Sequence, residues 1–447
     1  MAAEPYQDTR RSVLVAVACS WCLFWTMIVN RSGGIVFVTM ISEMGATREA
    51  ASWPFSLLGA VSNIFGLLSG ILLRKLSLRA VSVLGSTLVA AGILLSVAFY
   101  GVIGITLCIG LVTAIGQGMI FPSNMVAINT YFQKYRATGS GISYVGGTLV
   151  SFIFPPLLVY MNDQYGLRGT LLIVGGLSLN ALAGSLLIAK PRSTRKRRAA
   201  EGAAVEMEPL KQNIQTAKGE KAPDKKEALR EELNFMRRPI YYVIVFTGVV
   251  FAYNLVMFSV TVVDHGMGRG LSKLAAATLL SCYGGGELVG RFCSGILSDK
   301  KLCHRRDIMA MGFFLMSLSL VALIYANSMP LLGAASVLFG LTGGSIMILF
   351  SVLLVEYFGL KKLPMAIGIH CLVNGLSALP RPLIIGFYRD RGSSYNGMYM
   401  LLAAISLITS LLWAIECFVK WRAEKAQADQ CDDRKLADRK PDSECAT

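Results

Sequence analysis

Two oppositely charged residues stand four positions apart inside a long apolar segment. The stretch from Gly284 to Asp299 reads GGGELVGRFCSGILSD and contains Glu287 and Arg291. Residues spaced i and i+4 share one face of a helix, so the carboxylate and the guanidinium can neutralise each other. A guanidinium also binds the carboxylate of a ligand through two parallel hydrogen bonds. The pair is therefore either a structural ion pair or a functional site at which the guanidinium could bind an anion. The second interpretation is favoured, because apolar side chains would be less costly to bury than a structural pair.

Four further polar residues interrupt apolar segments, namely Arg31, Arg381, His370 and Asn374. Arg31, in VNRSGG, either attracts an anion or extends to the membrane surface. Arg381, in ALPRPL, is either a second anion-binding charge or an interfacial arginine beside a proline kink. His370 and Asn374 are spaced i and i+4, and such a pair more often joins helices by hydrogen bonds than relays protons. Inserting an ionisable side chain at the bilayer centre costs at least about 2.5–3.5 kcal/mol of free energy. Each ionisable residue among these four is therefore a candidate functional residue.

The elements that carry these residues are predicted to be transmembrane helices. The chain has 447 residues, of which 54% are hydrophobic and 16% charged, and its mean hydropathy is +0.56. A soluble protein usually has about a quarter of its residues charged. Runs of eighteen or more apolar residues are long enough to cross a bilayer. The sequence therefore predicts an all-α polytopic membrane protein with 12 transmembrane helices in two six-helix halves. The apolar segments cover residues 12–41, 51–73, 80–101, 103–125, 138–160 and 170–189, and then 240–263, 274–298, 307–326, 330–356, 364–388 and 396–420.

The distribution of lysine and arginine predicts the orientation of these helices. Basic residues collect in alternate short loops, and such loops are usually cytoplasmic. Both termini and the central loop are therefore expected in the cytoplasm. The predicted parts are a tail at 1–11, one half at 12–189, a central loop at 190–239, the second half at 240–420 and a tail at 421–447. The charged, aromatic-poor composition of the central loop is typical of a disordered or partly helical linker, and the charged last tail is expected to be disordered.

A short internal repeat relates the two halves. Residues 69–72 and 294–297 both read SGIL, and each copy ends the second span of its group before a basic loop. Parallel repeats of six spans, with a binding site near the membrane midplane between them, are one known plan of secondary transporters.

Several other classes of function are excluded by what the sequence lacks. The net charge of +16 lies in loops without aromatic or zinc motifs, which points to anionic lipid of the bilayer and not to nucleic acid. Most of the ten cysteines lie in apolar segments, so no disulfide framework is expected. No phosphate-binding loop and no H-E-x-x-H motif is present. We therefore expect neither an ATP-driven pump nor an enzyme, and no cofactor or metal.

Longer motifs resemble a known family. Gly290-Arg291-x3-Gly295-x-Leu297-x-Asp299 looks like the cytoplasmic loop motif of the major facilitator superfamily. The stretches at 129–147, NTYFQKYRATGSGISYVGG, and at 353–395 are similar to motifs of its monocarboxylate transporter family, solute carrier family 16. The chain is identified as a member of that family over nearly every span. It departs from the family where the first loop motif lacks its aspartate, and where an acidic residue followed by Gly-Gly-Trp-Gly-Trp is missing before the first span.

The resemblance implies a fold, a cargo and site residues. It implies the major facilitator fold and transport of a small monocarboxylate, such as lactate or pyruvate, with a proton by alternating access. Arg291 would anchor the substrate carboxylate, and Glu287 stands where the family has a proton-coupled aspartate. When the substrate occupies Arg291, Glu287 loses its partner and should take up a proton more readily. Arg31 stands where the family has a lysine, and an arginine cannot release a proton.

Alternatives remain open at this stage. The chain could carry another organic solute, such as an aromatic amino acid or a hormone-like anion, without proton coupling. It could also be a membrane sensor that transports nothing. The resemblance further implies a plasma-membrane location and a possible single-span glycoprotein chaperone as partner.

Overall fold

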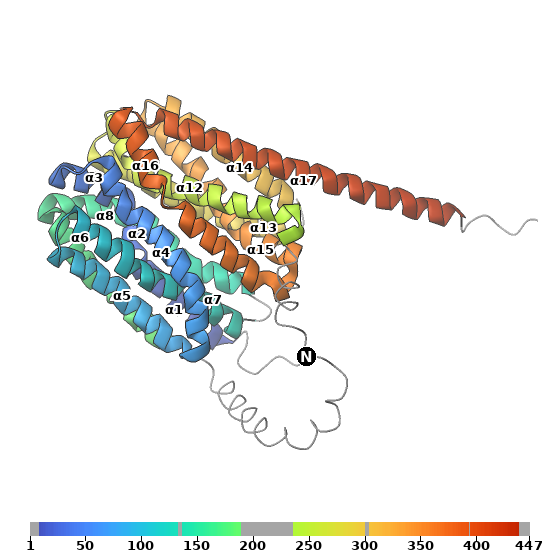
Figure 1. Ribbon diagram of the computed structural model, residues 1–447, viewed down its shortest axis with the longest axis horizontal. Coiled ribbons are helices and arrows are strands. Elements are labelled where there is room, and N and C mark those ends of the chain that lie inside the picture. The colour runs from blue at the N-terminus through green and yellow to red at the C-terminus, as the bar shows by residue number, and fades with distance from the viewer. Residues whose placement is uncertain (1–8, 133–135, 189–235, 300–303, 393, 438–447) are drawn as a thin grey trace, which may run out of the picture.

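The fold is built from helices packed side by side. The computed structural model describes residues 9–132, 136–188, 236–299, 304–392 and 394–437, and no strand occurs among them. The first group of helices comprises α1 (Arg10–Thr26), α2 (Ile28–Arg31), α3 (Gly33–Met44), α4 (Arg48–Lys75), α5 (Leu78–Ala98), α6 (Val102–Leu107), η1 (Cys108–Thr113), α7 (Ala114–Tyr131), α8 (Arg136–Ser178) and α9 (Ala181–Leu187). The second comprises α12 (Pro239–Gly268), α13 (Lys273–Asp299), α14 (Arg305–Tyr325), α15 (Met329–Ser377), α16 (Arg381–Gly386), η3 (Phe387–Arg391) and α17 (Asn396–Ala437). Figure 1 shows the two groups in blue to green and in yellow to red.

The apolar segments of the sequence coincide with these helices. Eight helical segments in the described part are long and apolar enough to cross a membrane. One of them, Thr138–Leu187, has 50 residues, more than one crossing of a hydrocarbon core about 30 Å thick requires. Gly166 in its middle has a φ of 65° and breaks it into two. The prediction of an all-α membrane fold is confirmed, whereas the count of twelve spans and the orientation of the termini stay predictions.

Helix α15 also folds back on itself. The ring centroids of Phe350 and His370 are 4.8 Å apart. Twenty residues of straight helix would separate them by about 30 Å. The chain therefore reverses direction between these two residues, as the separate apolar segments at 330–356 and 364–388 predict.

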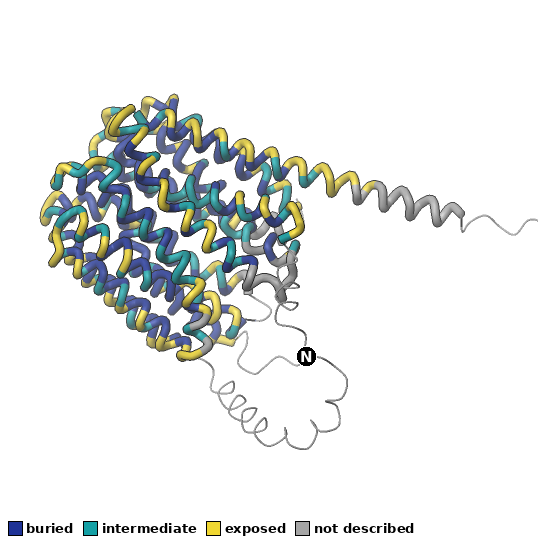
Figure 2. The backbone as a smooth tube through the Cα atoms, viewed as in Figure 1, coloured by how far each residue is buried: buried dark blue, intermediate teal, exposed yellow. Residues whose placement is uncertain are grey.

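Most exposed apolar residues lie on the outside of the bundle. Figure 2 shows buried positions along the contacts between helices and exposed positions on the periphery. Large apolar side chains such as Phe152, Phe292 and Leu411 are more than half exposed. A surface of this kind suits contact with lipid, and the polar residues at the centre of the bundle must then find partners inside the protein.

The two groups of helices meet along two seams. On one side α8 packs against α13, and we call this contact the α8–α13 seam. On another, α4 packs against α15 and α16, and we call this the α4–α16 seam. A third contact joins α3 to α12, where Gly34 lies against the backbone of Ser259 and Val260.

Paired glycines bring α13 and α15 close together. Gly286 and Gly290 of α13 face the backbone of Val337 and Leu341, and Gly340 and Gly344 of α15 face the backbone of Tyr283 and Glu287. A methyl group on any of the four glycines would collide with a carbonyl oxygen. The reciprocal Gly-x3-Gly spacing thus allows backbone contact between the helices, as in many membrane bundles. It fixes the position of the helix that carries Glu287.

The first predicted span is interrupted beside its arginine. The chain leaves regular helix at Met27 and at Ser32, which separate α1, α2 and α3. The Asn30 amide donates a hydrogen bond to Gln117 Oε1 at 3.1 Å, and Gln117 Nε2 donates to the Thr26 carbonyl at 3.1 Å. This side-chain network stabilises the broken turn and orients Arg31, a feature that the continuous segment predicted at 12–41 did not include.

The last helix differs from the sequence-based expectation. The tail at 421–447 was expected to be disordered, but α17 continues to Ala437 and projects beyond the bundle in Figure 1. Ala, Lys, Glu, Arg and Gln, which favour helix, make up most of residues 422–430, and this composition accounts for the extension. The central loop predicted at 190–239 lies almost entirely outside the described residues.

The glycine contact gives a stability prediction. Gly286→Ala should lower the free energy of unfolding by about 1–3 kcal/mol, because the methyl group collides with the Val337 carbonyl. Thermal unfolding of the detergent-solubilised protein measures this. Gly285→Ala is the control, since no atom of the described residues lies within 4 Å of the methyl group that it would add. Equal melting temperatures for the two variants would show that the helices do not approach this closely.

Candidate functional site

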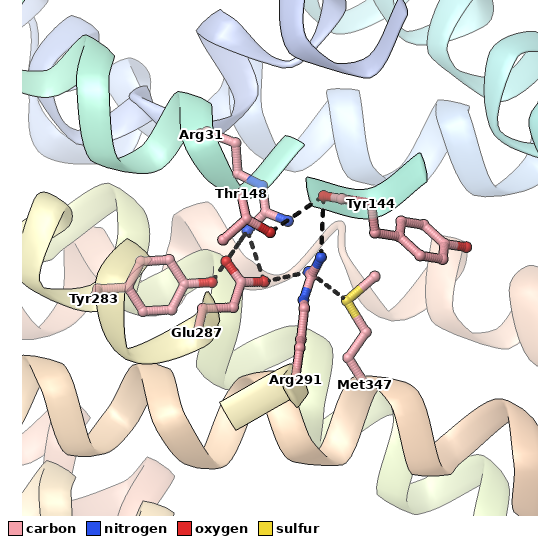
Figure 3. Close-up of polar contacts among 7 residues, drawn as sticks. All are labelled: Arg31, Tyr144, Thr148, Tyr283, Glu287, Arg291 and Met347. Atoms are coloured by element: carbon pink, nitrogen blue, oxygen red, sulfur yellow. Dashed lines mark hydrogen bonds and ion pairs between the residues drawn. The ribbon is translucent and has the colours of Figure 1, made fainter. Parts of the chain in front are cut away.

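A buried carboxylate shared by two arginines lies at the centre of the candidate site. Glu287 of α13 is only 2% exposed. Its Oε1 accepts a hydrogen bond from Arg291 Nη2 at 2.6 Å, and its Oε2 accepts one from Arg31 Nη1 at 2.9 Å (Figure 3). Arg31 comes from the first group of helices, whereas Glu287 and Arg291 come from the second. The predicted pair at i and i+4 is therefore part of a triad that joins the two halves of the molecule.

A tyrosine extends this triad. The Tyr283 hydroxyl accepts a hydrogen bond from Arg31 Nη1 at 3.2 Å, and the ring is buried. Tyr283, Glu287 and Arg291 follow one another at intervals of four residues, so they occupy a single face of α13. Sequence analysis missed Tyr283, although the same spacing that identified the pair could have identified it.

Apart from Glu287, Arg291 contacts only weak hydrogen-bond acceptors among the described residues. Its Nη1 donates to the Tyr144 carbonyl at 3.2 Å, and its guanidinium lies 5.7 Å from the centroid of the Tyr144 ring. Its Nη2 lies 3.1 Å from the sulfur of Met347, a poor acceptor. Its Nε is buried and has no hydrogen-bond partner among the described residues. The guanidinium therefore has donors that a carboxylate from outside the protein could use.

The charges of the triad do not cancel. Two guanidinium groups surround one carboxylate, which leaves one net positive charge in a site that is almost closed to solvent. A buried net charge is unfavourable unless a counter-charge arrives. A small anion would supply it. No cluster of side chains able to hold a metal ion occurs in the described part of the chain.

The other predicted site residues lie apart from this triad. Arg381 is 2% exposed, and its guanidinium stacks on the Tyr253 ring at 4.7 Å. His370 is 8% exposed and packs against Phe350. Neither these two nor Asn374 contacts Glu287 through any hydrogen bond or ion pair in the described structure. The burial of Arg381 and the ion pair of Arg31 mean that neither residue is the interfacial arginine considered from the sequence.

A second charged network closes one end of the bundle. Asp264, at the end of α12, accepts hydrogen bonds from Arg48 Nε at 2.8 Å and from the Tyr395 hydroxyl at 2.7 Å. The carboxylate of Asp390 accepts from the backbone amides of Arg48 and Glu49 at 3.2 and 3.0 Å. A carboxylate at a helix N-terminus is favourable, because the unpaired amides and the helix dipole point at it. These contacts tie the start of α4 to the second half, and sequence analysis did not find them.

The triad gives a test of charge balance. Glu287→Gln should destabilise the protein by about 3–5 kcal/mol, because it leaves two buried guanidinium groups without their carboxylate. Adding Arg31→Met to this variant should restore part of the loss, since one buried charge is then removed. Thermal unfolding of the single and double variants measures both effects. A single variant as stable as the wild type would mean that the arginines do not depend on Glu287.

The network at the end of the bundle gives a test by hydrogen exchange. The Asp264 carboxylate lies between Arg48 and Arg389, and its Oδ2 is 3.6 Å from Arg389 Nε. Asp264→Asn removes this negative charge, so the backbone amide hydrogens of residues 33–44 and 258–268 should exchange several times faster. Asp163→Asn is the matched control, because its ion pair with Lys273 is half exposed and contributes little. Equal exchange in both variants would show that Asp264 does not hold the halves together.

Comparison with known proteins identifies the family. The model of the Major Facilitator Superfamily matches residues 13–305 and 268–435. Among curated relatives, monocarboxylate transporter 12 of Mus musculus is 24% identical over 418 residues, covering 91% of this chain and 85% of that protein. Monocarboxylate transporter 13 of Rattus norvegicus is 26% identical over 383 residues, covering 86% and 83%. Monocarboxylate transporter 4 of Gallus gallus is 24% identical over 391 residues, covering 85% and 76%.

Solved structures share the same architecture. A POT family transporter in complex with 5-aminolevulinic acid superposes with a TM-score of 0.69 at 14% identity, covering 92% of this chain and 97% of that chain. The peptide transporter POT in complex with sulfate gives 0.66 at 15% identity, covering 92% and 96%. At these identities the likeness shows the fold alone. The predicted major facilitator fold and the resemblance to monocarboxylate transporters are both confirmed, and this membrane-spanning chain belongs to the major facilitator superfamily of transporters, which are not enzymes.

Proposed function

We propose that this protein carries a small organic monocarboxylate of the lactate and pyruvate class across a membrane by alternating access. The observation that carries the proposal is the buried carboxylate of Glu287, held by Arg31 from one half and by Arg291 from the other. The guanidinium groups outnumber the carboxylate in this triad, so the site attracts a substrate carboxylate even beside Glu287. The similarity to three monocarboxylate transporters supports this class of cargo.

Binding begins with an exchange of partners at Arg291. The substrate carboxylate replaces the Met347 sulfur and the Tyr144 carbonyl, which are weaker acceptors than an anion. It then competes with Glu287 for the same guanidinium. The planar fork of an arginine suits this role, because it binds both oxygens of a carboxylate at once.

Proton coupling follows from the fate of Glu287. A carboxylate that has lost one of two cationic partners in a buried site is less stable as an anion, so Glu287 takes up a proton when the substrate occupies Arg291. The hydrogen bond from Arg31 to Glu287 crosses between the halves, and neutralising Glu287 weakens it. Loading the site thereby frees the two halves to move, which gives obligatory coupling of proton and anion.

One observation favours a second candidate function. Arg31 touches Glu287 directly, and unlike a lysine it remains charged throughout the cycle. If Arg31 keeps Glu287 ionised even in the loaded state, the protein carries an organic anion without a proton. Under either candidate we propose a plasma-membrane location and a single-span glycoprotein as the chaperone, both on the family resemblance.

Uptake into proteoliposomes tests the proposal. Labelled lactate and pyruvate should enter faster with an inward proton gradient. Arg291→Ala should abolish this uptake, while Arg291→Lys keeps the charge without the planar fork and should raise KM by about tenfold. The control is Arg168→Gln, which removes an exposed guanidinium near Tyr100 at the end of the bundle.

Each outcome assigns the function differently. Uptake that ignores the proton gradient but requires Arg291 would favour the uncoupled carrier. An absence of lactate and pyruvate uptake by correctly folded protein would overturn the monocarboxylate class. Uptake by Arg291→Ala at the wild-type rate would show that Arg291 does not bind the substrate carboxylate.

A further inference from the structure

A buried guanidinium in the α4–α16 seam has no acidic partner in the part of the chain that the structure describes. Arg381 is 2% exposed, and its side chain makes no hydrogen bond or ion pair with any residue that the structure describes. Its one strong contact is the Tyr253 ring, 4.7 Å from the guanidinium carbon. An unpaired charge is costly to bury, and a ring face compensates only part of that cost.

Neighbouring polar groups on the same span also lack partners. His370 Nδ1 and Asn374 Oδ1 are buried without a hydrogen bond to any described residue, as is Arg381 Nε. His370 and Asn374 are one helical turn apart on one face of α15, and Arg381 begins α16 directly after the turn at residues 378–380. Buried polar groups without a partner need an explanation, and the charged one among these three, Arg381, is the most costly to leave unpaired.

This seam lies at the same depth in the bundle as the triad. Tyr253 and Glu287 both stand about fifteen residues, or roughly 20 Å of helix, from the end where α12 finishes and α13 begins. The triad contacts α8 through Tyr144, whereas Arg381 lies against Gly59 of α4. The triad and Arg381 therefore lie at the same depth between the halves, but in different seams.

The state of the cations differs between the seams. Arg31 and Arg291 are both bound to Glu287. Arg381 has the same charge, but none of the described carboxylates forms an ion pair with it. On the strength of the transport function proposed above, we propose that Arg381 forms a second subsite of the transport pathway, which binds the carboxylate group of the substrate before or together with the triad.

The surroundings of Arg381 suit this role. The Tyr253 hydroxyl donates to the Ser377 carbonyl at 2.5 Å, which fixes the ring beneath the guanidinium. On the opposite helix Gly59 has no side chain, and a Cβ there would lie 3.5 Å from Arg381 Nη1. The fork is thus held in one orientation with little bulk in front of it, and a preorganised fork binds a carboxylate with a smaller loss of entropy.

The missing side chain at Gly59 allows a test that needs no substrate. Gly59→Asp places a carboxylate beside Arg381 Nη1, and Gly59→Asn places a neutral group of the same shape there. If Arg381 is an unpaired cation, the Asp variant should melt several degrees above the Asn variant. Equal melting temperatures, or a lower one for Asp, would overturn the proposal, because they would mean that the guanidinium already has a counter-charge.

Transport and ligand binding complete the test. Gly59→Asp should raise KM for labelled pyruvate by about tenfold or more relative to Gly59→Asn, because its own carboxylate occupies the subsite. Arg381→Gln should do the same, while Arg168→Gln should retain the wild-type KM. Wild-type KM in both Gly59→Asp and Arg381→Gln would overturn the proposal.

A failure of the proposed function can be told apart from a failure of this subsite. If the wild type carries neither lactate nor pyruvate, the function is wrong, and the subsite is judged by thermal shift with pyruvate, benzoate and sulfate. A shift in the wild type and in Gly59→Asn that is lost in Gly59→Asp supports an anion site at Arg381. No shift with any of the three overturns it.

Discussion

The ion triad of Arg31, Glu287 and Arg291 is the interaction on which the rest of the structure depends. It puts three charged groups in a region where each would be unstable alone, and it draws them from both halves of the molecule. Its geometry needs a broken first span to aim Arg31, with Asn30 and Gln117 bracing the break. It also needs α13 to be fixed, which the four glycines shared with α15 achieve. A hydrophobic core of the same shape would be more stable and would have no means of responding to an anion.

The charged groups at the end of the bundle and those at its centre have different roles in the contact between the halves. The network around Asp264 and Asp390 lies at the end of the bundle and pairs every charge it contains with an opposite one or with a helix N-terminus. At the depth of Glu287, by contrast, the described guanidinium groups outnumber the carboxylates. Such a division suits a molecule whose halves must separate at one end while a bound anion stabilises the middle.

Sequence analysis predicted the fold class, the apolar spans and the pairing of Glu287 with Arg291, because these depend on composition and on local helical spacing. It could not predict that Arg31 joins the pair, since the two residues are 256 positions apart and only tertiary packing brings them together. The ambiguity over Arg381 had the same origin. A span boundary uncertain by a few residues leaves an arginine near it either interfacial or buried, and only the contact with Tyr253 identifies its environment. The helical extension of α17 was missed because its charged composition is equally typical of a disordered tail and of a solvated helix.

Positive charge is balanced differently across the central layer. Arg31 and Arg291 share the carboxylate of Glu287, whereas Arg381 has no ion pair with a described residue. A permanently charged group at the position of Arg31 cannot itself pass on a proton, so a proton that moves with the substrate must reside on another group, and Glu287 is the carboxylate that Arg31 contacts. On the proposal made above, Arg381, which has no carboxylate partner among the described residues, has a clear physical role. It would offer the incoming carboxylate a partner that belongs to no existing ion pair, whereas a carboxylate at Arg291 has to compete with Glu287 for the same guanidinium. On the two proposals together, the carrier would capture its anion at Arg381 and would change conformation only when Arg291 gives up Glu287.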